Sequence, residues 1–178
     1  ILPAGVVMPN FRFKTVLVSV YLLTITTEAW GMGLFDSLKV CLFSEVNGTV
    51  LMKGKPLAGV EVIQTAQINS GKIFTYTTTT DEQGRFHFDA RFSHSINKIA
   101  PVQPRVPQNI LFRHQGKEYR GWKTSKFNYD VGGEINSLPE RESLRDLKQI
   151  VLKCDLADES RIKEQELGSN IIGICEFL

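Results

Sequence analysis

Apolar and polar positions alternate along much of the chain from residue 40 onward, the pattern of β-strands with one buried face. Residues 60–64 alternate in this way, and residues 73–80 form a run of β-branched and aromatic side chains. Glycine and proline turns separate such runs at intervals of about ten residues, which is typical of a β-sandwich. We therefore predict an all-β domain whose core includes Val60, Val62, Phe86, Phe88 and Leu152.

Other segments depart from this pattern. Prolines recur at every third position from 101 to 107, so residues 93–108 are expected to form a surface loop before a strand resumes at Ile110. A pair of glycines predicts a mobile loop over Asn128 to Asn136, and residues 139–147 could form one or two helical turns. The segment from Ala157 is charged and then apolar, and the pattern does not place it.

The first 31 residues have the composition of a secretory signal peptide. Arg12 and Lys14 supply the positive region, an apolar run extends from Val16 to Ile25, and small residues precede a cleavage site before Met32. The run is shorter than the roughly 20 apolar residues that span a bilayer. Residues 1–7 precede the first methionine and are interpreted as an over-extended start. Export predicts a periplasmic protein, whereas translation from Met32 would leave the protein in the cytoplasm.

The composition is that of one folded domain. Apolar side chains make up 42% of the 178 residues and charged side chains 22%. We expect the domain to span residues 32–156 and a C-terminal tail to follow at 157–178. The net charge of +2 arises from 21 basic and 19 acidic residues, a balance that argues against a nucleic-acid surface. Apart from the export signal, no membrane association is expected.

Three cysteines follow the signal peptide: Cys41, Cys154 and Cys175. In an oxidising compartment two of them can pair. A bond from Cys41 to Cys154 would join the first and last predicted strands and close a long loop, worth roughly 4–5 kcal/mol in the chain-entropy model. A bond from Cys154 to Cys175 is the alternative.

The segment from Val46 to Phe88 resembles the transthyretin-like, carboxypeptidase-regulatory-like domains. It contains Gly48-Thr49-Val50, a Gly-x-Pro turn followed by Ala58-Gly59-Val60, and a hairpin from Thr80-Asp81 to Gly84 and Phe86. The resemblance implies a seven-stranded, transthyretin-like (prealbumin-like) Greek-key sandwich. It also implies a binding or structural module.

Short motifs, Val40 to Ser44 and Leu152 to Cys154 among them, are similar to a small proteobacterial family of unassigned function. Cysteines corresponding to Cys41 and Cys154 recur in that family, so this resemblance favours the disulfide between them. The insertion at 139–145 and the tail after Ala157 depart from the family pattern.

The residue types that support catalysis or metal binding lack the required spacing. His87, His94 and His114 are not separated by the intervals of a metal site, so ligands would have to converge from separate loops. The sequence contains no nucleophile elbow and no phosphate-binding loop. We therefore expect a protein without enzymatic activity, metal or cofactor.

Basic and aromatic residues concentrate between positions 112 and 129, the composition of a protein-binding hot spot. Alternation across a hairpin would place some of the rings outward beside arginines, although a core position is the stronger interpretation for Phe112 and even for Trp122. The candidate contact residues are Arg113, Tyr119, Arg120, Trp122, Lys123, Phe127 and Tyr129.

The lead hypothesis is an exported protein-binding module, an immunity protein that neutralises a secreted antibacterial toxin by forming a stoichiometric complex. It depends on the small size, the export signal, the lack of catalytic motifs and the family resemblance. The alternative is a cell-envelope or carbohydrate-binding accessory domain, because carbohydrate-binding surfaces use the same residue types.

Overall fold

The structure, a computed structural model, describes residues 37–69, 71–134, 149–163 and 170–178. The chain divides into two compact units, Ile1–Leu38 and Lys39–Leu178, and all of the strands belong to the second. The signal-peptide region and the predicted helical turns at 139–147 lie outside the described residues. Apart from turns, loops and the short 3-10 helix η1 (Ile96–Lys98), the described part of this unit is β-strand, which confirms the all-β class. No helix among the described residues is long and apolar enough to cross a membrane.

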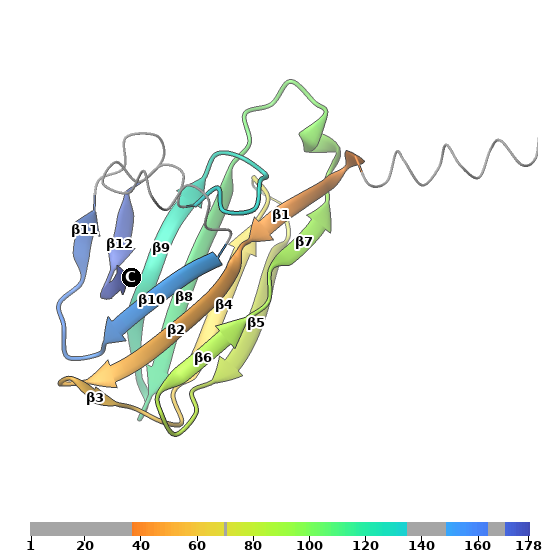
Figure 1. Cartoon of the computed structure of the whole chain (residues 1–178). Helices are drawn as coiled ribbons and strands as arrows, with labels where there is room; N and C mark the ends of the chain where they lie inside the picture. The colour runs from red at the N-terminus through yellow and green to blue at the C-terminus, as the bar shows by residue number, and fades with distance from the viewer. Residues whose placement is uncertain (1–36, 70, 135–148, 164–169) are drawn as a thin grey trace, which may run out of the picture. The chain divides into compact units, whose positions relative to one another are not determined.

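One layer of the unit is built around the first long strand. Its members are β1 (Lys39–Phe43), β2 (Glu45–Met52), β3 (Lys55–Pro56), β6 (Arg85–Phe88), β7 (Arg91–His94), β10 (Gln149–Asp155) and β13 (Cys175–Phe177). β2 lies between β10, which pairs with it in parallel, and β6, which pairs antiparallel (Figure 1). β13 pairs with the other side of β10. β1 and β7 pair with each other and continue β2 and β6 along the same layer.

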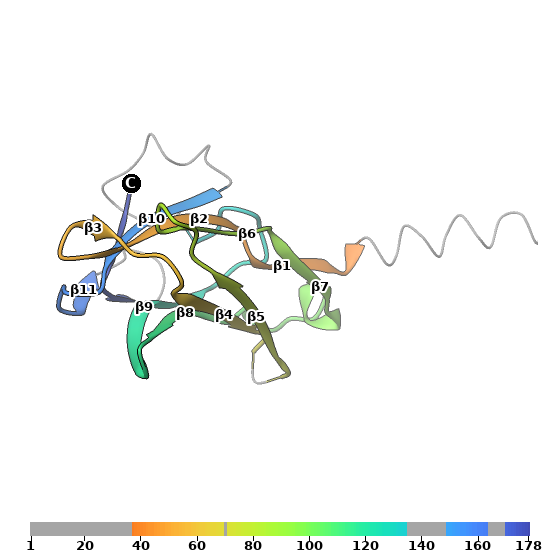
Figure 2. The same ribbon diagram turned by 90° about the horizontal axis from the view of Figure 1, so that it is seen from below.

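The second layer is a six-stranded antiparallel sheet in the order β11-β12-β9-β8-β4-β5. Its members are β4 (Glu61–Gln67), β5 (Ile73–Thr79), β8 (Val106–His114), β9 (Lys117–Lys126), β11 (Arg161–Lys163) and β12 (Ile171–Gly173). Figure 2 shows this sheet facing the first layer. The chain crosses between the layers after β3, β5, β7, β9, β10 and β12. The unit is therefore a β-sandwich rather than a barrel.

The core lies between the two layers. Buried and partly exposed positions alternate along β2, β4, β8 and β10, so one side of each strand faces inward. The five predicted core residues, Val60, Val62, Phe86, Phe88 and Leu152, are each no more than 5% exposed, which confirms the predicted register of these strands.

β8 begins at Val106, four residues before the strand expected at Ile110. The pairing between β8 and β4 ends at Gln108, one residue after Pro107. Proline has no backbone N–H, but at this position no hydrogen bond to β4 requires one. The surface loop is therefore shorter than predicted, and Val106 belongs to the core.

The C-terminal segment, which the sequence pattern does not place, closes one edge of the sandwich. β12 pairs with β9 in the second layer, and β13 pairs with β10 in the first. Ile171, Cys175 and Phe177 are buried along these strands. Residues 170–178 are thus part of the sandwich, and their buried side chains belong to its core.

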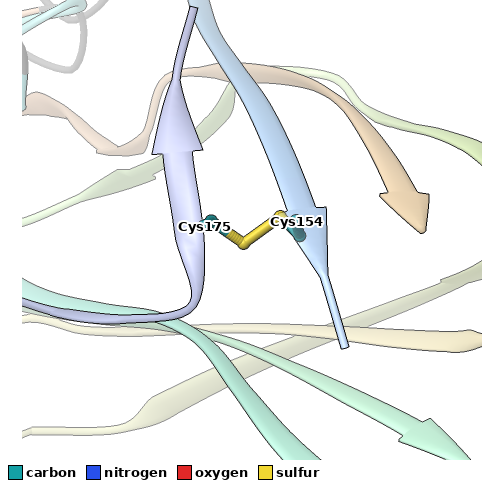
Figure 3. Close-up of a disulfide and its surroundings, with 2 residues drawn as sticks. All are labelled: Cys154 and Cys175. Carbon is teal, nitrogen blue, oxygen red and sulfur yellow. A yellow bond between two sulfur atoms is a disulfide. The ribbon is translucent and has the colours of Figure 1, made fainter. Parts of the chain in front are cut away.

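The disulfide joins Cys154 to Cys175, and Cys41 is a buried free cysteine. Figure 3 shows the bond connecting β10 to β13, where the two residues lie opposite each other with Cα atoms 4.1 Å apart. The favoured pairing of Cys41 with Cys154 is wrong. Cys154 lies beside Val50 of β2, and Cys41 precedes Val50 by nine residues, or about 30 Å of extended strand. A disulfide requires Cα atoms within about 7 Å.

Non-reducing peptide mapping is expected to recover Cys154 linked to Cys175 and Cys41 as a thiol. Because the bond closes a loop of 21 residues, reduction should lower the free energy of unfolding by about 3 kcal/mol. The matched control is Cys41→Ala, in which the effect of reductant on stability should be unchanged. Recovery of Cys41 in a disulfide would contradict the assignment.

Candidate functional site

The predicted hairpin exists and carries all of the candidate contact residues on it or just after it. β8 and β9 are joined by a tight turn at Gln115 and Gly116, which have φ values of 48° and 75°. Two successive positive φ values are the requirement of a type I′ hairpin turn, which explains the glycine. The turn signal in the sequence therefore predicted this connection correctly.

A β-bulge at Gly121 divides the hairpin into two registers. Leu111 pairs with Arg120, whereas Ile110 pairs with Trp122, so Gly121 is an extra residue in β9. A Cβ atom at Gly121 would lie 2.5 Å from the Phe112 ring, which explains why glycine is needed. The bulge shifts the alternation by one residue and turns Trp122 inward.

Trp122 is consequently a core residue and not a contact residue, in agreement with the stronger interpretation of the sequence. It is fully buried, and its ring lies edge-on to Phe43 and Phe177, with centroids 5.3 and 5.7 Å away. Tyr119, on the other side of the bulge, is partly buried and packs against the same core. Neither ring stands on the outer face beside the arginines.

Arg120 and Lys123 do lie on the outer face of the second layer. Across the strands, Arg120 is level with Leu111 and Ile63, and Lys123 is level with Asn109 and Ile172. Within the part of the chain that the structure describes, neither cation forms an ion pair. This outer face therefore combines partly exposed aliphatic side chains with two cations that have no acidic partner among the described residues.

Arg113 lies on the same face but is already paired. Its guanidinium contacts Glu61 at 3.0 Å and Glu118 at 2.7 Å. The hydrogen bonds that Arg113 donates to the Glu118 carboxylate and the nearby charge of Glu61 raise the pKa of Arg113. A partner would have to displace two carboxylates to use this arginine.

Phe127 and Tyr129 lie at the far end of β9. Phe127 is seven residues beyond Arg120, which corresponds to about 20 Å of strand. Tyr129 lies beside β1, where its carbonyl oxygen accepts a hydrogen bond from the N–H of Cys41 at 3.0 Å. The seven predicted contact residues therefore do not form one surface, and only Arg120 and Lys123 share an open outer position.

The segment from Asn128 to Glu134, predicted to be mobile, is held by a buried polar cluster. The Glu134 carboxylate accepts hydrogen bonds from the Ser44 hydroxyl at 2.6 Å, from the Ser44 N–H at 3.1 Å and from the Gln108 amide at 2.6 Å. The Lys126 ammonium lies 3.4 Å from the same carboxylate, and both side chains are fully buried. Gly132 donates its N–H to the Ser44 hydroxyl at 2.8 Å.

The chemistry of this cluster is that of a structural brace. Ser44 interrupts the run from β1 to β2, and its hydroxyl donates to a carboxylate while it accepts from Gly132, so it is oriented by the fold. Burial raises the pKa of the nearby Cys41 thiol, which the positive charge of Lys126 partly opposes. Because Ser44 and Cys41 are no more than 2% exposed, neither is placed to attack a substrate.

The remaining polar features offer little support for catalysis. A shallow hollow of about 400 Å³ is lined by Gln67, Asn69, Arg105 and Pro107. Asn69 bonds to both backbone groups of Arg105 there, which ties the β4–β5 turn to the start of β8. In the described ranges, no group of three His, Cys, Asp or Glu side chains could hold a metal ion.

Comparison with known families gives a match that covers most of the sandwich. The family described as a domain of unknown function, DUF6795, matches residues 46–159. The chain belongs to this family. The matched region runs from β2 past β10 and includes the β8–β9 hairpin, Lys126 and Glu134. No curated protein and no solved structure matches the chain.

Proposed function

We propose that this DUF6795 protein is an exported, non-enzymatic binding module that neutralises a secreted antibacterial toxin by forming a stoichiometric complex. The observation that carries the proposal is the outer face of the second layer, where Arg120 is level with Leu111 and Ile63, and Lys123 is level with Asn109 and Ile172. Arginine beside apolar side chains on a rigid sheet is the composition of a protein-binding surface. These two cations have no acidic partner among the described residues, and they favour an acidic partner surface.

We also propose that the sandwich is of the transthyretin-like type. Seven strands make up its frame, β6, β2 and β10 in one layer and β5, β4, β8 and β9 in the other. The crossings between layers support a Greek-key connection. β1 and β7 then count as continuations of β2 and β6, and β11 to β13 as additions at one edge.

Export is supported by the signal-peptide pattern before Met32 and by the disulfide, because such bonds persist in oxidising compartments. Expression from Met8 followed by cell fractionation tests this part of the proposal. We expect the protein in the periplasm with an N-terminus near Met32. Full-length protein in the cytoplasm would contradict export.

The binding surface is tested with the double variant Arg120→Ala and Lys123→Ala. A protein captured by the purified chain must be toxic when expressed alone and harmless when the chain is co-expressed. The double variant should weaken that complex by about 2 kcal/mol or more, because two charges at the centre of the surface are removed. Affinity is measured by calorimetry, which also reports the stoichiometry.

The matched control removes two exposed lysines from the first layer, Lys55→Ala and Lys153→Ala. It changes the net charge equally and should bind with the wild-type affinity. Thermal unfolding should show that both variants remain folded. Equal loss of affinity in the two variants would contradict the assigned face, and capture of an envelope polysaccharide instead of a protein would contradict the function.

A further inference from the structure

β5 is an open edge of the second layer. It is the last strand of the sheet order, and among the described strands it pairs only with β4. Ile73, Thr75, Thr77 and Thr79 are exposed along it. The other described strands at sheet edges, β1, β3, β6, β7, β11 and β13, have two to five residues, whereas β5 has seven.

The unpaired backbone groups of β5 belong to its exposed residues. Thr80 donates its N–H to Val60, and its carbonyl oxygen accepts from Gly59, so residue 80 points its backbone toward β4. Backbone direction alternates along a strand. Residues 74, 76 and 78 therefore also bond toward β4, and the N–H and C=O groups of Ile73, Thr75, Thr77 and Thr79 face outward.

This edge lacks the usual protection against strand pairing. Natural edges carry charges, prolines or bulges that prevent another strand from adding. β5 reads Ile-Phe-Thr-Tyr-Thr-Thr-Thr, without a charge or a proline, and its register with β4 is regular from Ile73 to Thr79. On the inner side, the Arg91 guanidinium lies 4.4 Å from the centre of the Tyr76 ring. The edge is thus uncharged, and no described strand pairs with its outer side.

We propose that β5 pairs antiparallel with β5 of a second copy of this chain, which joins the two second layers into one continuous sheet. Centred on Tyr76, this register places Thr75 opposite Thr77 and Ile73 opposite Thr79 of the other copy. All four outward residues then meet outward residues, so each pair can exchange two backbone hydrogen bonds. Threonine pairs across strands are favourable in themselves.

The charges at the two ends of β5 select this orientation. Lys72 precedes the strand, and Glu82 follows it in the turn before β6. Asp81, next to Glu82, is already paired with Arg85. Antiparallel pairing brings the basic end of one copy toward the acidic end of the other at both ends of the interface. Parallel pairing would instead bring the two lysines together.

Sedimentation of the purified protein from about 1 μM to about 1 mM tests the proposal, since this range covers weak dimers. We expect a dimer, and slower hydrogen exchange of the Thr75 and Thr77 amides as the concentration rises. The variant Thr75→Lys/Thr77→Lys should reduce self-association at least about tenfold, because the introduced lysines face each other. The variant Thr75→Glu/Thr77→Glu should do the same. An equimolar mixture of the two variants should restore the dimer.

The control Thr65→Lys/Gln67→Lys adds the same charge to β4, an inner strand of the sheet that lies between β5 and β8, and should dimerise as the wild type does. Thermal unfolding checks that each variant is folded. A monomeric wild type at about 1 mM would overturn the proposal, as would a dimer that either charged β5 variant leaves intact. The proposal would also be overturned if the β4 control lost the dimer, or if the mixture of the lysine and glutamate variants of β5 failed to form one.

Discussion

Glu134→Gln is expected to lower the free energy of unfolding by about 3–5 kcal/mol, because it leaves the buried Lys126 ammonium without its counter-charge. The carboxylate also accepts hydrogen bonds from Ser44 and Gln108, and glutamine can replace only part of them. Chemical denaturation measures the loss. A matched control is Glu176→Gln, which breaks the exposed pair with Arg161 and should cost less than about 1 kcal/mol.

Glu134→Gln should also release the segment from Asn128 to Glu134, which the buried polar cluster holds against β1. Cys41 is buried beneath this segment and bonds to Tyr129 through its backbone N–H. Alkylation of the Cys41 thiol should therefore be faster in Glu134→Gln than in the wild type. The double variant with Lys126→Met should recover part of the lost stability, since no unpaired charge remains buried. Two outcomes would show that water reaches the ion pair. One is a double variant that loses the sum of the two single losses in stability, and the other is a loss below about 1 kcal/mol in Glu134→Gln.

The buried ion pair marks a limit of prediction from sequence. A lysine and a glutamate are almost always exposed unless they are paired, so Lys126 and Glu134 carried no signal of burial. The carboxylate is satisfied by Ser44, which lies 90 residues earlier in the chain. Only the folded sandwich brings these groups together, and the paired glycines before Glu134 suggested mobility instead.

The alternation of apolar and polar residues predicted the buried side chains correctly in strands that have one buried side and no β-bulge. β4 and β10 satisfy this condition, and Val60, Val62 and Leu152 are buried as predicted. β9 does not satisfy it, because the extra residue at Gly121 reverses the alternation before Trp122. An isolated glycine inside a strand is itself a signal of a bulge. A bulge at this position agrees with a core position for Trp122, which was already the stronger interpretation of the sequence, and it leaves Arg120 outside.

The C-terminal segment depends on tertiary structure that no local pattern contains. A Cβ atom at Gly173 would lie 2.0 Å from the Gly121 carbonyl oxygen, so β12 packs directly against the bulge of β9. β13 then reaches β10 in the other layer and places Cys175 opposite Cys154. Both pairings of Cys154 were compatible with the sequence, and the order of strands decides between them.

Phe86→Ala is expected to lower the free energy of unfolding by about 3–5 kcal/mol, as for other deletions of buried aromatic rings. Phe86 is 5% exposed and lies edge-on to Phe88 in its own strand and to Phe112 in the opposite layer, with centroids 6.2 and 5.8 Å away. Its loss would leave a cavity between the layers. The control Phe92→Ala removes a ring that is 42% exposed, and should cost less than about 1 kcal/mol.

Gly48 provides a sharper test of where the Phe86 ring lies. The two residues are paired across β2 and β6, and a Cβ atom at Gly48 would lie 2.2 Å from the ring. Gly48→Ala alone should therefore destabilise by about 1–3 kcal/mol through overpacking. In the double variant with Phe86→Ala the added methyl group meets no ring and fills part of the cavity. The double variant should thus lose clearly less stability than the sum of the single losses. Strictly additive losses would mean that the ring does not cover Gly48, and that the register between β2 and β6 differs from the one described.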